Sequence, residues 1–235
     1  MAIISKFLAT VKRNIEFPVI VLFAASFGYF LLTLGLFSLG GFHFLPVVMG
    51  WNLFLAVLPL VFSMLVGFAI QNNRKGFAAM AGILWLLFFP NAPYMITDII
   101  HLHLFEYSGT SGFVQNMVGW SWLLYVSMGI LLGITTGMMS MELIYQRLVQ
   151  RKGRKAAYTS VLVISLLSGY AIFVGRFLRL NSWDVVRPWL MAQKLVKNIN
   201  GFMVAFTLLM TVYILLVYGL FHLLYSNSPT LNKSK

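Results

Sequence analysis

A proline-interrupted polar segment near residue 90 holds the residue types of this chain best suited to chemistry. The sequence FPNAPYMITD, residues 89–98, lies inside a long apolar stretch. Each of its two prolines lacks an N–H and frees a carbonyl group four residues earlier, which lipid cannot satisfy. Two interpretations are open. The helix is merely kinked, with Asn91 and Thr97 satisfying its own backbone, or it is a broken helix that forms a ligand site.

Asp98 and His101 are the candidate catalytic residues. An ionisable group at the edge of a membrane span indicates a functional site. If the chain continues as a helix, Asp98 and His101 share a face at a spacing of three. Together with His103 and Glu106 they are possible ligands for zinc or iron. Their spacing matches no known metal motif, so we predict no metal site and leave the cofactor unknown.

A second polar block, GRFLRLNSWD, covers residues 175–184. Arg176 and Arg179 point to one side if this segment is helical, and two guanidinium groups suit a carboxylate or a phosphate. Asn181 can cap a following helix, with Asp184 in its first turn. The alternatives are arginines that extend toward the membrane surface, or an ion pair of one arginine with Asp98 or Asp184.

The elements that must position these residues are membrane-spanning helices. Apolar residues make up 60% of the 235-residue chain and charged residues 9%, which excludes an ordinary soluble domain. A helix of about 20 apolar residues crosses the hydrocarbon layer. We predict an all-α fold with one transmembrane domain, residues 1–235, and an interfacial helix at 183–199. The predicted spans are 17–39, 45–70, 77–98, 114–141, 157–178 and 201–225.

The basic residues predict the orientation of these spans. With both termini in the cytoplasm, the inner segments contain Lys and Arg, including the run from Arg147 to Lys155, and the first two outer loops contain none. The third outer segment departs from the rule that Lys and Arg stay on the cytoplasmic side. Because positive charge on the outer side opposes correct insertion, we expect these basic residues to serve another purpose. Its basic residues are Arg176, Arg179, Arg187, Lys194 and Lys197.

The predicted topology brings polar residues from distant parts of the chain to the outer side of the membrane. The span 45–70 begins there, and the spans 77–98 and 157–178 end there. This convergence predicts a polar site in the outer leaflet that binds or processes an anionic lipid head group or a lipid-linked substrate. The candidate ligand-binding residues are Trp51, Asn52, Asn91, Tyr94, Arg176, Arg179, Asn181 and Asp184.

Several classes of function are disfavoured. The net charge of +12 comes from residues at span ends, so it indicates contact with anionic lipid rather than nucleic acid. The absence of cysteine excludes disulfides and thiolate metal sites. Serine, histidine and acid do not occur in a recognisable triad order, and the chain has no glycine-rich phosphate loop. A small transporter or channel, and a non-catalytic assembly or regulatory partner, remain alternatives.

A stripe of glycines in the span 114–141 indicates close helix packing. Gly129, Gly133 and Gly137 follow one another at four-residue spacing and form a flat face. The face can receive a helix of the same chain or a helix of a partner protein. The expected partners are therefore the lipid bilayer, an anionic lipid or lipid-linked ligand, and a helix that packs on this stripe.

The two polar blocks together resemble an uncharacterised bacterial family of small multi-pass membrane proteins. The resemblance is carried by FPNAPYxxTD and GRFxRxNSWD, and also by the stretch that begins with Trp51 and Asn52 and runs to Pro59. It implies a bacterial plasma membrane. The family is defined by a domain of unknown function, so it implies no activity and assigns no catalytic residue.

The absence of cysteine allows a direct test of this topology. Single cysteines at Lys152, Glu106 and Asp184 are labelled in intact cells with a membrane-impermeant thiol reagent. We expect positions 106 and 184 to react and position 152 to stay protected, because the two polar blocks are predicted to share the outer face. If position 184 reacts only after lysis, the basic segment is cytoplasmic and the predicted shared site is wrong.

Overall fold

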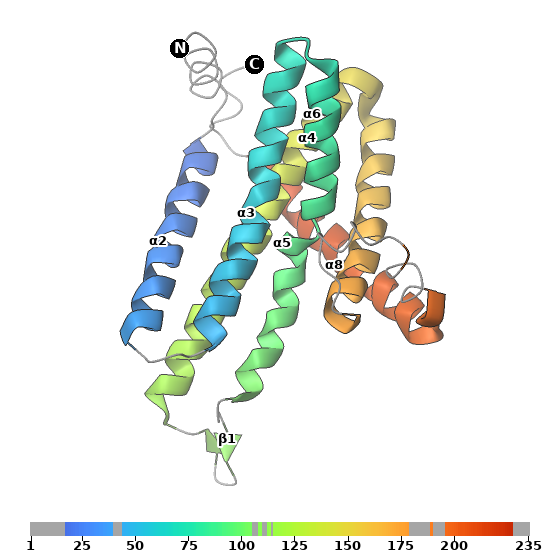
Figure 1. The fold of residues 1–235 in the computed structure, drawn as a ribbon. Helices are drawn as coiled ribbons and strands as arrows, with labels where there is room; N and C mark the ends of the chain where they lie inside the picture. Colours follow the sequence, from blue (N-terminus) through green and yellow to red (C-terminus); the bar gives the residue numbers. More distant parts are fainter. Residues whose placement is uncertain are drawn as a thin grey trace. The chain divides into compact units, whose positions relative to one another are not determined.

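The computed structural model describes residues 17–39, 44–104, 108–109, 112–113, 115–178, 189 and 196–227. Its elements, in chain order, are α2 (Phe17–Leu39), α3 (Phe44–Gln71), α4 (Lys75–Phe88), α5 (Asn91–Tyr94), the 3₁₀ helix η1 (Met95–Leu104), the short antiparallel strands β1 (Ser108–Gly109) and β2 (Gly112–Phe113), α6 (Met117–Phe177) and α8 (Gly201–Ser226) (Figure 1).

The described part of the chain contains five helical stretches long and apolar enough to cross a membrane. They are Phe17–Ser38, Phe44–Gln71, Lys75–His103, Met117–Phe177 and Gly201–Ser226. The fold is therefore an all-α polytopic bundle, as the sequence predicts. The chain divides into two compact units: the first is Met1–Leu58 with Asn91–Gly137, and the second is Pro59–Pro90 with Met138–Lys235.

The helix that begins at Lys75 is interrupted where the prolines predict. The regular helix α4 ends at Phe88, and the amide of Phe89 still donates to the carbonyl of Trp85 at 2.8 Å. Beyond Pro90 the chain makes only the four residues of α5 before it tightens into η1. A proline without an N–H cannot continue the regular hydrogen-bond ladder, which explains the change of helix type.

The long helix α6 reverses its direction at Gly153. This residue has φ 84° and ψ 168°, which a residue with a Cβ rarely adopts. The rings of Tyr145 and Tyr158 lie 5.3 Å apart, although a straight helix would separate these residues by about 20 Å. The sequence predicts separate helices at 114–141 and 157–178. The structure continues the first one through the basic run, because Arg, Lys and Gln are good helix formers.

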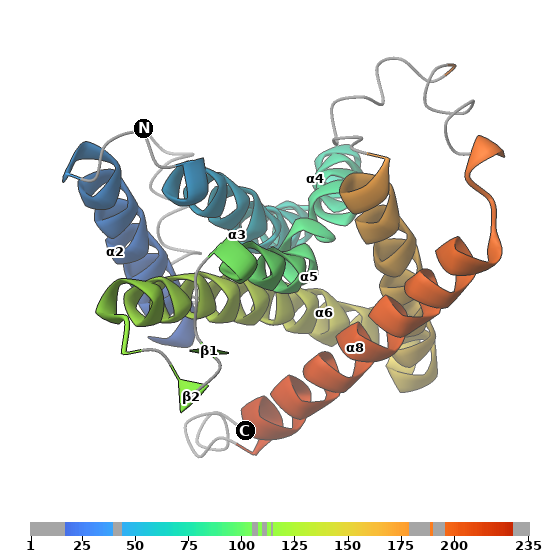
Figure 2. The ribbon, with the colours of Figure 1, turned by 90° about the horizontal axis from the view of Figure 1, so that it is seen from below.

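Helix α6 packs through its glycine stripe in the first unit. A Cβ added at Gly129 would meet Tyr29 and Met49, one at Gly133 would meet Met95 and Ala56, and one at Gly137 would meet Ala92. The neighbours come from α2, α3, α5 and η1. Figure 2 shows the green segment that contains α5 and η1 between α3 and α6. The stripe therefore lets several segments of the same chain approach α6 closely.

The second unit has its own buried contacts. The indole Nε1 of Trp85 on α4 donates to Ser140 Oγ on α6 at 3.2 Å. Gly169 lies against the backbone and side chain of Thr207 and Thr211 on α8. The rings of Phe177 and Phe202 meet edge to face at 5.0 Å. Small residues and aromatic rings thus bring α8 against α6.

The glycine contacts lead to a stability prediction. Gly137→Leu forces a side chain into Ala92, and overpacking of this kind costs about 1–3 kcal/mol. We expect a lower unfolding temperature for the purified protein in detergent. Gly28→Leu on α2 is the matched control, because nothing lies within 4 Å of a Cβ there. Equal unfolding temperatures for the two variants would contradict the packing described here.

Candidate functional site

The 3₁₀ geometry of η1 positions the acidic residue of the first polar block. Three residues per turn place Met95, Asp98 and His101 in one row along the helix. Met95 is fully buried and points to Gly133, so the same row directs Asp98 inward. On α3, Asn52 lies one turn before Ala56, which also faces Gly133. The glycine stripe and the tight helix together bring Asn52 and Asp98 to the same place.

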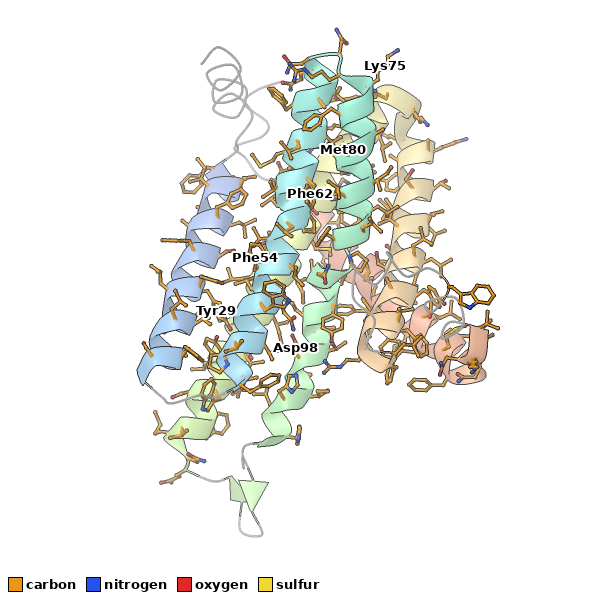
Figure 3. The ribbon with its side chains drawn as sticks, in the orientation of Figure 1. Tyr29, Phe54, Phe62, Lys75, Met80 and Asp98 are labelled. Atoms are coloured by element: carbon orange, nitrogen blue, oxygen red, sulfur yellow. The ribbon has the colours of Figure 1, made fainter. Side chains whose placement is uncertain are left out.

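Asp98 is a buried carboxylate with a defined hydrogen bond. Its side chain is 0% exposed, and the amide Nδ2 of Asn52 donates to Oδ2 at 2.7 Å. His101 Nε2 lies 3.8 Å from Oδ1, within ion-pair distance, and its side chain is 26% exposed. Figure 3 shows Asp98 on η1 and Tyr29 on α2. A buried charge is costly unless it is paired and hydrogen-bonded, so Asn52 and His101 help to stabilise the buried carboxylate.

A tyrosine pair on α2 and α6 lies in the same unit as this carboxylate. The Tyr29 hydroxyl donates to the carbonyl of Tyr125 at 3.2 Å, and the two rings stack at 4.8 Å. Thr33 Oγ1 lies 2.8 Å from the Tyr125 hydroxyl. The sequence analysis did not identify these residues, although Tyr29 and Thr33 stand at a helical spacing of four in a charge-free span.

An apolar cavity of about 320 Å³ lies next to the tyrosine pair. Tyr125 belongs to both features, and the Trp122 ring meets the Tyr125 ring edge to face at 5.5 Å. The cavity has the size of a small ligand pocket. The residues that line it are Leu36, Met117, Val118, Ser121, Trp122 and Tyr125. The first unit therefore combines a buried carboxylate, a polar tyrosine pair and an apolar hollow.

Other predicted site residues on the first unit have different surroundings. Trp51 is 50% exposed and its ring packs against Phe54 at 5.6 Å. Asn91 begins α5, and Tyr94 ends it with its carbonyl accepting from Thr97 Oγ1 at 2.7 Å. Asn91 and Tyr94 are both half-buried. Among the candidates, a hydrogen bond and an ion-pair contact join Asn52, Asp98 and His101 into one cluster.

The second polar block is only partly within the described residues. Arg176 lies half-buried in the last turn of α6, in the second unit. Arg179, Asn181 and Asp184 lie outside the described residues, as does most of the predicted interfacial helix at 183–199. Their roles therefore stay predictions.

A second buried carboxylate, Glu142, was missed by the sequence analysis. It is 2% exposed on α6 and contacts Tyr218 and His222 of α8, in the second unit. The sequence does contain an indication of this cluster. Glu142 is one of five acidic residues in the chain, and Tyr218 and His222 are four apart in an apolar helix. Among the described residues, no group of three His, Cys, Asp or Glu side chains could hold a metal ion.

The long apolar helices define a multi-pass membrane protein. The chain belongs to the family described as "Protein of unknown function (DUF1361)", whose model matches residues 51–217. This range includes Asn52, Asp98, His101 and Glu142, and it ends before His222. Comparison with curated proteins and with solved structures produced no match.

The Asn52–Asp98 contact can be measured by a double-mutant cycle. We compare Asn52→Ala, Asp98→Ala and the double variant by unfolding in detergent. Residues in direct contact couple by about 0.5–3 kcal/mol, so we expect the double variant to lose less stability than the sum of the single losses. Additive losses would show that the amide and the carboxylate do not interact in the folded protein.

Proposed function

We propose that this protein binds a lipid or a lipid-linked substrate, with the polar head group at the Asp98 cluster and an apolar chain in the apolar cavity of the same unit. The site belongs to the outer leaflet of a bacterial plasma membrane, with six spans and both termini in the cytoplasm. The observation that carries the proposal is the fully buried Asp98 carboxylate, held by Asn52 in the same unit as an apolar cavity.

The chemistry of the cluster suits a hydroxyl-bearing head group. An ionised carboxylate accepts hydrogen bonds only, and Asp98 Oδ2 already accepts from Asn52. His101 Nε2 lies 3.8 Å from Oδ1 of the same carboxylate. A ligand hydroxyl would donate to Oδ1. The partly exposed His101 would form a hydrogen bond with the same ligand hydroxyl. It would act there either as a ligand-binding residue or as a base.

The apolar part of the ligand has a separate place. Five side chains of the cavity lining are apolar or aromatic, and Ser121 adds one hydroxyl, which donates to the Met117 carbonyl at 2.7 Å. Burial of each methylene group contributes about 0.8 kcal/mol. Tyr125 lines the cavity and stacks on Tyr29, in the same unit as Asp98. An amphiphile can therefore use both features of the first unit.

The arginines of the second polar block are a separate part of the proposal, which rests on the sequence. The sequence favours Arg176 and Arg179 as residues that bind a carboxylate or a phosphate. Because this assignment rests on the sequence, Arg179→Lys is tested separately from the Asp98 cluster. Arginine can bind a phosphate through two parallel N–H groups and lysine cannot. Loss of phosphate-bearing ligands in Arg179→Lys would therefore support the assignment.

Lipid analysis of the purified protein tests the proposal. Wild type, Asp98→Asn and Ser121→Trp are purified in mild detergent, and bound lipids are identified by mass spectrometry. We expect wild type to retain one lipid class. Ser121→Trp, which fills the cavity, should lose this lipid, and Asp98→Asn should retain less of it. Leu131→Trp is the matched control, because Leu131 is 66% exposed on the same helix and does not line the cavity.

The same variants can exclude the proposal. Identical lipid profiles in wild type, Asp98→Asn and Ser121→Trp would show that the cluster binds no lipid.

Transport is the second candidate function, and the broken helix at Pro90 favours it. Flux in proteoliposomes that Asp98→Asn abolishes, together with an unchanged lipid profile, would favour transport over lipid binding.

A further inference from the structure

The Glu142 cluster lies in the second unit and has no part in the lipid site proposed above. The Tyr218 hydroxyl donates to Glu142 Oε2 at 2.9 Å, and Gln146 Nε2 donates to Oε1 at 3.2 Å. His222 Nδ1 lies 2.8 Å from Oε2. Both carboxylate oxygens are thus already acceptors, although the side chain is 2% exposed. Three polar side chains converge on one buried carboxylate.

This arrangement predicts which nitrogen of His222 carries a proton. An ionised carboxylate accepts hydrogen bonds only, so it cannot donate to a ring nitrogen. With Glu142 ionised, His222 Nδ1 is therefore the donor in the 2.8 Å contact. In the neutral ring the other nitrogen, Nε2, then has a lone pair. A carboxylate on Nδ1 is also the arrangement that holds the histidine of hydrolase triads in its reactive tautomer.

The ring of His222 is held in one orientation but is not enclosed. Tyr145 packs on it edge to face at 5.0 Å, and Tyr218 stacks on it at 5.9 Å. The side chain remains 24% exposed, whereas Glu142 is buried. His222 lies four residues before Ser226, the last residue of α8, or about 6 Å along the helix axis. The ring is therefore close to the end of the helix and partly accessible.

The other titratable groups around the cluster come from both legs of α6. Tyr145 is on the first leg and Tyr158 on the second, and their rings lie 5.3 Å apart. The positive charge of Arg154 acts on Tyr145. Glu142 is the acidic group of this set, and His222 is the group whose ring nitrogen can accept a proton.

We propose that Glu142, Tyr218 and His222 form a second polar site, in which His222 Nε2 accepts a proton from a hydroxyl group or water. The proton leaves the donor oxygen and binds Nε2, while Nδ1 keeps its own proton. The ring then has a charge of +1, which the Glu142 carboxylate balances at 2.8 Å. Glu142 and Tyr218 are positioning residues, and the ligand class is a neutral hydroxyl compound or water.

Nitrogen NMR of the histidine rings tests this assignment. The full chain contains four histidines, so the full-length protein labelled at its imidazole nitrogens and held in lipid nanodiscs gives few signals. The His222 signal is identified by its loss in His222→Gln. At a pH where the ring is neutral, we expect Nδ1 to be protonated and Nε2 to be unprotonated. A His222 signal with its proton on Nε2 would overturn the proposal.

Variants separate this role from simple packing. Glu142→Gln keeps the shape but can both donate and accept, so we expect His222 to lose its single Nδ1–H tautomer. Leu224→Ala on α8, at a side chain that is 78% exposed, is the matched control, with the tautomer unchanged. If Glu142→Gln does not fold, the wild-type signal alone still decides the tautomer.

Chemical modification measures the reactivity of Nε2 directly. Diethyl pyrocarbonate acylates an unprotonated imidazole nitrogen, and peptide mass spectrometry reports each histidine separately. We expect His222 in nanodiscs to be modified, and modified several-fold more slowly in Glu142→Gln than in Leu224→Ala. A His222 that stays unmodified in the wild type would show a structural ring with no accessible base, and the proposal would fail.

Discussion

The interrupted helix sets the constraint on which the first unit depends. Lipid offers no hydrogen-bond partners, so backbone that leaves the regular helix must be covered by protein. The residues that follow the break meet this requirement through glycine. Ala92 and Met95 lie against Gly137 and Gly133 of α6. Side chains at Gly133 and Gly137 would keep α5 and η1 away from α6. Asp98 would then have no enclosed position beside Asn52.

Both acidic residues in the described part of the chain, Asp98 and Glu142, are buried, and hydrogen-bond donors surround each carboxylate in a similar way. Asp98 has an amide donor from a different helix and a histidine on its own turn. Glu142 has a tyrosine and a histidine from a different helix and an amide on its own turn. Stability alone does not favour buried carboxylates, because apolar residues of similar size often do as well. Their retention inside apolar helices is the reason to assign them functions.

The sequence predicted what local rules control. Apolar length predicted the spanning helices, Pro90 and Pro93 predicted the interruption, and the spacing of Asp98 and His101 predicted their proximity. It could not predict pairings across the chain. Asn52 and Asp98 are 46 positions apart and Glu142 and His222 are 80 apart, so only the fold brings them together. The turn at Gly153 was also missed, since the basic residues around it favour helix rather than loop.

The position of that turn has a practical consequence. The leg of α6 from residue 117 to residue 152 is 36 residues, or about 54 Å, whereas the hydrocarbon layer is about 30 Å thick. Part of this leg must therefore extend beyond the hydrocarbon layer, or the leg must tilt strongly within it. The hairpin tip contains exposed Arg151, Lys152 and Arg154, and a Cβ at Gly153 would meet nothing within 4 Å. A rigid fusion domain inserted at this tip would continue two helices at once, which would give a small membrane protein the added mass that single-particle imaging needs.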